Sequence, residues 1–297
     1  MKGITVRLIG GLGNQLHCYA FGRALAEQND VVLEVDCESG YWNDPFGRSL
    51  LLDMFPALHL NKKKMPLAEH GRLFFKLSVK MIGWISQLLP LRRRFVVTEG
   101  RSSLGYQLEI HRTKYKSHPY FMGYWASYRY YEDVADQLRR ELFPPRPTHP
   151  RVLAILSDIL SVKSCSIHWR SYAEEVGVKR PSLVEYYQKA IATVERLQPD
   201  IRFYVFSDNP EAARSLLENT ALNLFFVDLN EARGDIQSLN DFYLMYACKH
   251  AIIGDSTFSW WAAWLSDFGS KTIVAPRGLS PWGDDWCPQN WISIDVK

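Results

Sequence analysis

Short apolar runs alternate with stretches of helical periodicity over most of the second half of the chain. The runs are rich in β-branched and aromatic residues, and each is followed by a stretch in which apolar residues recur at helical spacing. Parallel strands need such a crossover, so this order predicts a doubly wound α/β domain. We expect strands at residues 165–169, 202–207, 224–227, 251–253 and 272–275, and helices at about 183–197, 210–219, 237–249 and 257–265.

The first half opens with the same kind of unit and is less regular after it. Four prolines cluster at positions 144–150, and proline ends helices and stiffens extended links, so we place a domain boundary there. The prediction is two α/β domains, residues 1–147 and 148–297, with a cleft between them. In the first domain we expect strands at 4–9 and 31–35, a glycine-rich turn at 10–13, and helices at about 14–28 and 131–142.

The composition excludes several classes of protein. A net charge of +3 is too small to indicate a nucleic-acid-binding protein, and no apolar run reaches the length of a membrane span. The five cysteines are scattered without a C-x-x-C pair, which indicates neither a disulfide framework nor a zinc site. The sequence enters its first strand without a signal-peptide pattern. We therefore expect a cytoplasmic protein.

The segment 73–94 combines an amphipathic stripe with a cluster of arginines. Lys76 and Lys80 lie off the stripe, and three arginines follow at 92–94. Such a segment is typical either of a helix packed on its own domain or of a peripheral helix at an anionic membrane surface. We favour packing on the domain. The stripe consists of Leu73, Leu77, Met81, Ile82, Trp84, Ile85, Leu88 and Leu89.

Three loops that follow expected strands carry candidate ligand-binding residues. The first is Gly10-Gly11-Leu12-Gly13-Asn14-Gln15, where glycines let the backbone approach a ligand and a helix N-terminus favours an anion. It lacks the spacing of a dinucleotide-binding loop and the lysine of a Walker loop, and a tight connection is an equal alternative.

The second loop is His168-Trp169-Arg170, at the end of the expected strand 165–169. Arg170 offers a planar, permanently charged fork for phosphate oxygens, and an arginine at a buried strand end usually has an anionic partner. By strand alternation His168 lies on the same side. His168 can donate to or accept from a base or a ribose, and the alternative is a core histidine.

The third loop runs from Asp255 to Ser259 and opens a tryptophan-rich helix. Ser256 and Thr257 cap the helix, so their hydroxyls and the free N–H groups form an anion-binding nest, with plain N-capping as the alternative. The tryptophans at 260, 261 and 264 are interpreted as packing residues. Asp241, early in the preceding helix, either favours the helix dipole or accepts two N–H bonds from a guanine edge.

Taken together, these segments resemble the bacterial α-1,2-fucosyltransferase family over nearly the whole chain. Single motifs are weak, but their order and the last long motif are specific. The matching segments are Gly10-Gly11-Leu12-Gly13-Asn14-Gln15, Tyr19-Ala20-Phe21-Gly22, Gly123-Tyr124-Trp125, His168-Trp169-Arg170, Phe206-Ser207-Asp208-Asn209, Asn240-Asp241-Phe242-Tyr243-Leu244-Met245 and Ser256-Thr257-Phe258-Ser259-Trp260-Trp261-Ala262-Ala263-Trp264-Leu265.

The resemblance implies a glycosyltransferase B-type (GT-B) fold of two Rossmann-like domains, GDP-β-L-fucose as donor, inversion at the anomeric carbon and no metal or other cofactor. It implies an acceptor-side first domain and a donor-binding second domain. Arg170 is then expected at the pyrophosphate, with donors from Ser256, Thr257 and Phe258, and His168 and Asp241 at the guanosine. In the first domain Asn14, with Gly11 and Gly13, is expected near the fucose or β-phosphate, and Tyr124 and Trp125 at the acceptor.

Two departures from the family pattern affect the expected chemistry. The family reads His-x-Arg-Arg-x-Asp, whereas here Ser171 follows Arg170 and the acidic residues are Glu174 and Glu175. Either glutamate replaces the missing base, or a loose transition state needs little base assistance because leaving-group stabilisation dominates. The second departure is Ala126, where the family often has glutamine, and it bears on the acceptor pocket.

The expected activity is transfer of L-fucose to the 2-hydroxyl of a terminal β-galactose. The acceptor would be an oligosaccharide or a lipid-linked glycan in O-antigen or surface polysaccharide synthesis, with peripheral contact to the inner face of the cytoplasmic membrane through 73–94. Alternatives are a fucosyltransferase of another linkage or acceptor, a GDP-sugar-binding protein that has lost turnover, and a nucleotide-sugar hydrolase. No nucleic-acid partner is expected.

Overall fold

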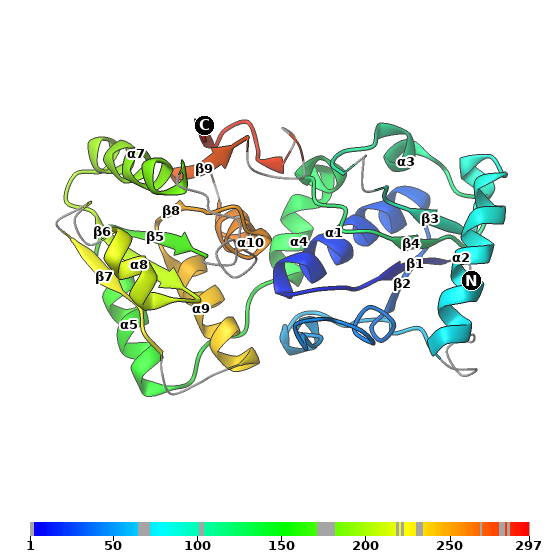
Figure 1. The fold of residues 1–297 in the computed structure, drawn as a ribbon, viewed down its shortest axis with the longest axis horizontal. Coiled ribbons are helices and arrows are strands. Elements are labelled where there is room, and N and C mark those ends of the chain that lie inside the picture. The colour runs from blue at the N-terminus through cyan, green and yellow to red at the C-terminus, as the bar shows by residue number, and fades with distance from the viewer. Residues whose placement is uncertain are drawn as a thin grey trace. The chain divides into compact units, whose positions relative to one another are not determined.

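The computed structural model describes residues 3–64, 72–100, 104–170, 182–217, 220, 223–229, 234–267, 269–278, 283 and 286–296. The chain forms two compact units, each built on its own sheet (Figure 1). The first unit comprises Met1–Leu142 and Pro281–Trp286, and the second comprises Phe143–Ser280 and Cys287–Lys297. Every strand pairing in the described part of the chain is parallel or closes a parallel bridge, as the β-α-β order of the sequence predicts.

The sheet of the first unit has four strands in the order β2-β1-β4-β3. The central strand β1 is almost wholly buried, and α1 packs closely on it because Gly22 has no side chain. A Cβ atom on Gly22 would lie 2.6 Å from Cγ2 of Val6. The strands are β1 (Gly3–Arg7), β2 (Val32–Asp36), β3 (Val96–Thr98) and β4 (Tyr120–Met122).

The helices of the first unit are short apart from α1 and α2. The first strand and the first helix predicted there are present with shifted ends. The helix expected over 131–142 divides into a 3₁₀ turn and the shorter α4. The α-helices are α1 (Leu12–Asn29), α2 (Arg72–Gln87), α3 (Leu108–Arg112) and α4 (Ala135–Glu141), and the 3₁₀ turns are η1 (Leu52–Met54), η3 (Leu91–Arg93), η4 (Tyr128–Tyr130) and η5 (Glu132–Val134).

The second unit has a six-stranded sheet in the order β10-β9-β8-β5-β6-β7. Its central strand β5 is buried throughout, because it has neighbours on both sides and helices on both faces. The strands are β5 (Ser164–Trp169), β6 (Arg202–Ser207), β7 (Leu224–Phe226), β8 (His250–Ile252), β9 (Ile273–Arg277) and β10 (Ile292–Asp295).

Side-chain alternation along β5 shows how the helices cover the two faces of this sheet. His168 lies against Phe258 of α10, whereas the next residue, Trp169, lies against Tyr187 of α7. α7 packs with α8, and α9 packs with α5 and α10. The unit is therefore a doubly wound α/β domain, as predicted. The helices are α5 (Pro150–Ser161), α7 (Ser182–Leu197), α8 (Pro210–Leu217), α9 (Asp235–Ala247) and α10 (Thr257–Leu265).

Helix α2 corrects the interpretation that we favoured for the apolar stripe. Val79, Gly83 and Ser86 are buried against the β3 side of the unit, but Leu77, Trp84 and most of the remaining stripe are exposed. The side chain of Leu73 lies outside the described residues. Periodicity predicted the helix correctly but assigned the wrong face to the core. No helix in the described ranges is long and apolar enough to cross a membrane.

Candidate functional site

The candidate donor site lies at the carboxyl edge of the second sheet, where three neighbouring strands end. Trp169 of β5 is paired with Ser207 of β6, and Ile167 of β5 is paired with Ile252 of β8. Parallel strands bring their following loops to one edge. The loops that begin at Arg170, Asp208 and Ile253 therefore lie beside one another, as the sequence predicted for the first and third of them.

His168 is a buried and neutral histidine. Burial, and next the neighbouring Arg170 guanidinium, lower the pKa of His168 to about 4, while the carboxylate of Asp208 opposes the shift. The ring centroid lies 5.7 Å from that of Phe258. Nδ1 is buried and has no hydrogen-bond partner among the described residues. A buried polar atom without a partner is costly, so this nitrogen is suited to a ligand.

Arg170 follows directly on the end of β5 and differs from His168 in its exposure. Its side chain is 45% exposed, and Nε lies 3.6 Å from Oδ2 of Asp208. Asp208 follows β6 and belongs to the Phe206-Ser207-Asp208-Asn209 motif, for which the sequence suggested no role. The ion pair orients the guanidinium at the sheet edge, and its exposure leaves the fork accessible to an anion.

The loop after β8 packs directly on the His168 backbone. A Cβ atom on Gly254 would lie 2.9 Å from the carbonyl oxygen of His168 and 2.6 Å from the hydroxyl of Tyr187. Ser256 is the N-cap of α10, and its Oγ accepts a hydrogen bond of 3.3 Å from the backbone N–H of Phe258. Capping is thus confirmed, and the helix N-terminus lies next to His168. Thr257 is the first residue of α10.

Asp241 lies in the second turn of α9, next to a residue that packs on Phe258. Its neighbour Phe242 packs on Phe258 with 5.3 Å between ring centroids. Burial raises the pKa of the Asp241 carboxyl to about 7. The structure therefore brings His168, Phe258 and the Asp241 turn together. Trp260, Trp261 and Trp264 are buried and pack on one another, which confirms them as packing residues.

The remaining candidates lie in the first unit or outside the described residues. Glu174 and Glu175, the predicted bases, are outside the described residues. Gly11 is the N-cap of α1, and a Cβ atom added to it would have only the Arg48 side chain within 4 Å among the described residues. Gly13 is buried and Asn14 is half-buried in the first turn.

Gln15 fixes this glycine-rich loop from inside. Its amide nitrogen donates to the carbonyl oxygens of Gly10 (2.9 Å) and Ser49 (2.8 Å), and its Oε1 accepts from the backbone N–H of Leu51 at 2.9 Å. Gln15 is completely buried, and Gly10 has a φ of 72°, which favours glycine. The conformation of the loop is therefore set by the core, and Gly11 and Asn14 remain at its accessible edge.

The acceptor candidates Tyr124 and Trp125 differ in their exposure to solvent. Tyr124 is exposed, whereas Trp125 is completely buried and its ring stacks on Phe21 with centroids 4.2 Å apart. Trp125 is a core residue, so its predicted contact with an acceptor is corrected to a packing role. Its φ of 55° is uncommon for a bulky residue. The backbone after Gly123 is bent to place Tyr124 outside and Trp125 inside.

Glu99, which the sequence did not single out, holds this bend. It follows β3, and its Oε2 accepts hydrogen bonds from the backbone N–H groups of Tyr124 (2.6 Å) and Trp125 (3.1 Å). Burial raises the pKa of Glu99, while these N–H donors oppose the shift. A backbone hydrogen bond from Gly105 opposes the rise in pKa as well. No sequence signal points to Glu99, because β3 is too short to show a pattern.

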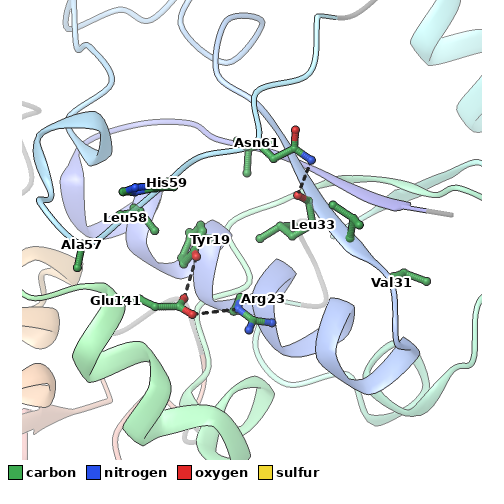
Figure 2. Close-up of a pocket in the computed structure, with 11 residues that line it drawn as sticks. Tyr19, Arg23, Val31, Leu33, Ala57, Leu58, His59, Asn61 and Glu141 are labelled. Atoms are coloured by element: carbon green, nitrogen blue, oxygen red, sulfur yellow. Dashed lines mark hydrogen bonds and ion pairs between the residues drawn. The ribbon is translucent and has the colours of Figure 1, made fainter. Parts of the chain in front are cut away.

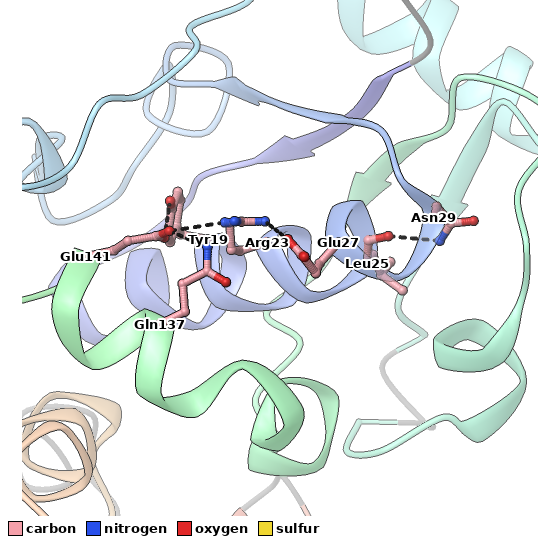
Figure 3. Close-up of polar contacts among 7 residues, drawn as sticks. All are labelled: Tyr19, Arg23, Leu25, Glu27, Asn29, Gln137 and Glu141. Carbon is pink, nitrogen blue, oxygen red and sulfur yellow. Dashed lines mark hydrogen bonds and ion pairs between the residues drawn. The ribbon is translucent and has the colours of Figure 1, made fainter.

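A separate hollow of about 390 Å³ opens beside β2 of the first unit (Figure 2). Tyr19, Arg23 and Glu141 form its polar side, but none of the predicted site residues lines it. Glu141 accepts from the Tyr19 hydroxyl at 2.9 Å, from Arg23 Nε at 3.3 Å and from Gln137 at 2.7 Å (Figure 3). This carboxylate accepts from three side chains and ties α1 to α4. Tyr19 of the Tyr19-Ala20-Phe21-Gly22 motif therefore has a structural role, because its hydroxyl helps to hold the two helices together.

Comparisons with known proteins identify relatives over the full chain. The model of glycosyl transferase family 11 matches residues 3–294. An Escherichia coli α-1,2-colitosyltransferase is 27% identical over 99% of this chain and 100% of its own length. The E. coli O-antigen biosynthesis glycosyltransferase WbnK is 39% identical over a shorter stretch, 32% of this chain and 30% of its own.

Solved structures share the fold at low sequence identity. The α-1,6-fucosyltransferase NodZ soaked with GDP-fucose superposes with a TM-score of 0.51 at 15% identity, covering 89% of this chain and 92% of NodZ. A mutant of Arabidopsis thaliana FUT1 in complex with GDP gives 0.55 at 15% identity, covering 94% and 71%. The fold is the GT-B glycosyltransferase fold expected from the sequence. With the family model spanning both units, the chain belongs to glycosyl transferase family 11.

Proposed function

We propose that the protein transfers an L-fucose-type sugar from a GDP donor to the 2-hydroxyl of a terminal β-galactose, with inversion and without a metal ion. The observation that carries the donor half is the arrangement around His168: a neutral, buried imidazole with an open Nδ1, next to Arg170 and the N-terminus of α10. Permanent positive charge and a helix N-terminus at one sheet edge suit a pyrophosphate.

Stabilising the departing GDP is the main task of this site. The bond between the anomeric carbon and the β-phosphate oxygen breaks, and GDP takes the electron pair. Arg170 and the α10 N-terminus then hold the developing negative charge, and losing one such donor commonly costs about 3 kcal/mol of transition-state stabilisation. The ionised Asp241 carboxylate accepts N–H bonds from the guanine edge, and His168 completes the contacts with the nucleoside.

The acceptor hydroxyl attacks from the opposite face and loses its proton. Glu174 or Glu175 takes this proton in one version of the proposal, because they lie one and two positions beyond the place where the family resemblance puts an aspartate. In the other version, a loose transition state leaves the proton to solvent after the new bond has formed. Tyr124 contributes to the acceptor side, since it is the exposed member of its pair.

A second donor is favoured by one of the relatives. The colitosyltransferase matches this chain from end to end, and colitose is a fucose that lacks the 3-hydroxyl. Discrimination between the two sugars depends on whether the site makes a hydrogen bond to that hydroxyl. A site that does so rejects the deoxy analogue strongly, because its own polar group would stay unpaired.

Turnover of GDP-fucose and GDP-colitose against a panel of terminal β- and α-galactosides tests the proposal, with product linkage read by NMR. An α-1,2-linked product on β-galactosides supports it, and the preferred donor decides between the two sugars. Another linkage would contradict the acceptor assignment. Release of free sugar without acceptor would indicate a hydrolase, and GDP binding without turnover would indicate a binding protein.

The same assay tests the metal-independent part of the proposal. A guanidinium and a helix N-terminus carry the charge of the pyrophosphate here, which is the task that a divalent ion performs in metal-dependent transferases. Transfer rates after dialysis against EDTA, with and without added Mg²⁺ or Mn²⁺, should therefore agree within about twofold. If EDTA abolishes activity and a metal ion restores it, the ion and not Arg170 neutralises the pyrophosphate.

A further inference from the structure

We propose that helix α2 docks the protein on an anionic lipid surface. The helix has two apolar faces, and among the described residues only one of them meets the rest of the protein. Gly83 faces β3, where a Cβ atom would lie 3.7 Å from Val96, and Ser86 Oγ accepts from the backbone N–H groups of Phe95 (2.9 Å) and Val96 (3.1 Å). This face is fixed to the core of the first unit.

The opposite face is apolar, and its described side chains are exposed. Positions 77, 81, 84, 85 and 88 recur at helical spacing and cover one side of the helix, away from Val79, Gly83 and Ser86. Trp84 is 68% exposed and Leu88 is 73% exposed. A surface helix ordinarily presents polar residues on that side. The exposed face, called the α2 patch, consists of Leu77, Met81, Trp84, Ile85 and Leu88.

The charge around the α2 patch selects the partner. Between Arg72 and Thr98 the sequence contains six basic residues and no acidic residue, although the whole chain carries only +3. Lys80, Arg92 and Arg93 are exposed. An apolar face on a segment whose charged side chains are all basic matches a bilayer with anionic headgroups.

The length of α2 indicates that it lies in the interface and does not cross the bilayer. Its 16 residues span about 24 Å at 1.5 Å per residue, short of the roughly 30 Å of a hydrocarbon core. Trp84 is the kind of residue that settles at headgroup depth. The patch therefore inserts its apolar side chains shallowly while the lysines and arginines contact the headgroups.

Flotation of the full-length protein with vesicles tests this proposal. We expect binding to phosphatidylcholine vesicles that contain phosphatidylglycerol, weak binding to pure phosphatidylcholine, and partial release by salt. Met81→Ser with Trp84→Ser should reduce the partition at least about tenfold, without lowering the melting temperature, because both side chains are exposed. Leu160→Ser, at a residue of α5 with 56% exposure, is the matched control and should bind as the native protein does.

Two further variants separate the charge from the apolar contact. Arg92→Gln with Arg93→Gln should weaken binding about fivefold per cation, whereas Lys189→Gln with Arg196→Gln on α7 should not. Quenching of tryptophan fluorescence by brominated lipid should fall in Trp84→Phe. Equal binding to neutral vesicles, or no binding to either, would overturn the proposal. So would a dimer in sedimentation that Trp84→Ser converts to monomer, because a second copy would then cover the patch.

Discussion

The hydroxyl of Tyr187 on α7 donates a hydrogen bond of 2.6 Å to the backbone carbonyl oxygen of His168 at the end of β5. Both groups are buried. This bond fixes the backbone of the candidate donor site from the face of the sheet opposite to α10. Gly254 closes over the same point, and its missing side chain leaves just enough room for the hydroxyl.

Gly254→Ala should destabilise the protein by about 1–3 kcal/mol, because the added methyl group overlaps the Tyr187 hydroxyl and the His168 carbonyl. Removing the hydroxyl with Tyr187→Phe makes room, so the double variant should be more stable than the sum of the two single changes predicts. Denaturant unfolding measures all three. Gly83→Ala, with a nearest neighbour at 3.7 Å in a helix, is the control and should be neutral or stabilising. Strict additivity would contradict the packing argument.

Arg170→Ala should lower the turnover number about a hundredfold or more while the protein stays folded. The side chain is 45% exposed, so its removal leaves no cavity, and the ion pair that it loses with Asp208 is itself exposed and contributes little to stability. Arg170→Lys should recover part of the rate, because it keeps the charge but not the planar fork. Steady-state kinetics and thermal unfolding of both variants provide the measurement. Near-native transfer by Arg170→Ala would remove the centre of the proposed mechanism.

Much of the second unit could be predicted from the sequence, because the inner strands β5, β6, β8 and β9 are largely buried and therefore form continuous apolar runs. The strand at Arg202–Ser207 and the helix at Thr257–Leu265 have the predicted ends. Helix α5 was missed, since Pro150 was taken as part of a link. Proline is in fact suited to the first turn of a helix, where its missing N–H is not needed.

The candidate site was only partly predictable. Strand-end position and residue chemistry were enough to place His168, Arg170 and Ser256 at the carboxyl edge of the second sheet. They did not indicate that Trp125 points into the core, since that depends on a positive φ enforced by Glu99. Nor could periodicity decide which face of α2 meets the sheet, because both faces are apolar and tertiary packing alone distinguishes them.

Asp241→Asn should raise the free energy of unfolding at pH 7 relative to the native protein. The pKa of Asp241 is about 7 in the folded state, against 3.8 for an unperturbed aspartate. As pH rises through 3.8, the unfolded chain ionises while the folded carboxyl keeps its proton, so stability falls until about pH 7 and is then level. Asparagine does not ionise, so Asp241→Asn removes this loss of stability. Chemical unfolding at about pH 4, 5.5 and 7.5 should show a gap that widens with pH, and a constant gap would contradict the argument.

The same residue should make GDP binding depend on pH. Only the ionised carboxylate accepts two N–H bonds from guanine, so affinity should rise as pH increases through about 7. Asp241→Asn should weaken GDP binding and flatten this dependence. Inosine diphosphate lacks the 2-amino group of guanine, so it can donate only one N–H bond to Asp241. The preference for GDP over inosine diphosphate should therefore be larger in the native protein than in Asp241→Asn. Calorimetric titration compares the two nucleotides, and an unchanged preference in Asp241→Asn would exclude Asp241 from base recognition.

Glu99→Gln should impair use of the acceptor more than use of the donor. The Glu99 carboxylate holds the backbone of Tyr124 and Trp125 in place through one oxygen, Oε2, and Gln keeps an oxygen there but lacks the negative charge that strengthens both bonds. The bend at Trp125 should then relax, because its unusual φ loses part of what enforces it. We expect a rise of several-fold in KM for the galactoside with little change in KM for the GDP sugar. Glu109→Gln, on α3, is the matched control and should change neither. An equal effect on both substrates would indicate a general loss of structure, and the melting temperature of each variant distinguishes that case.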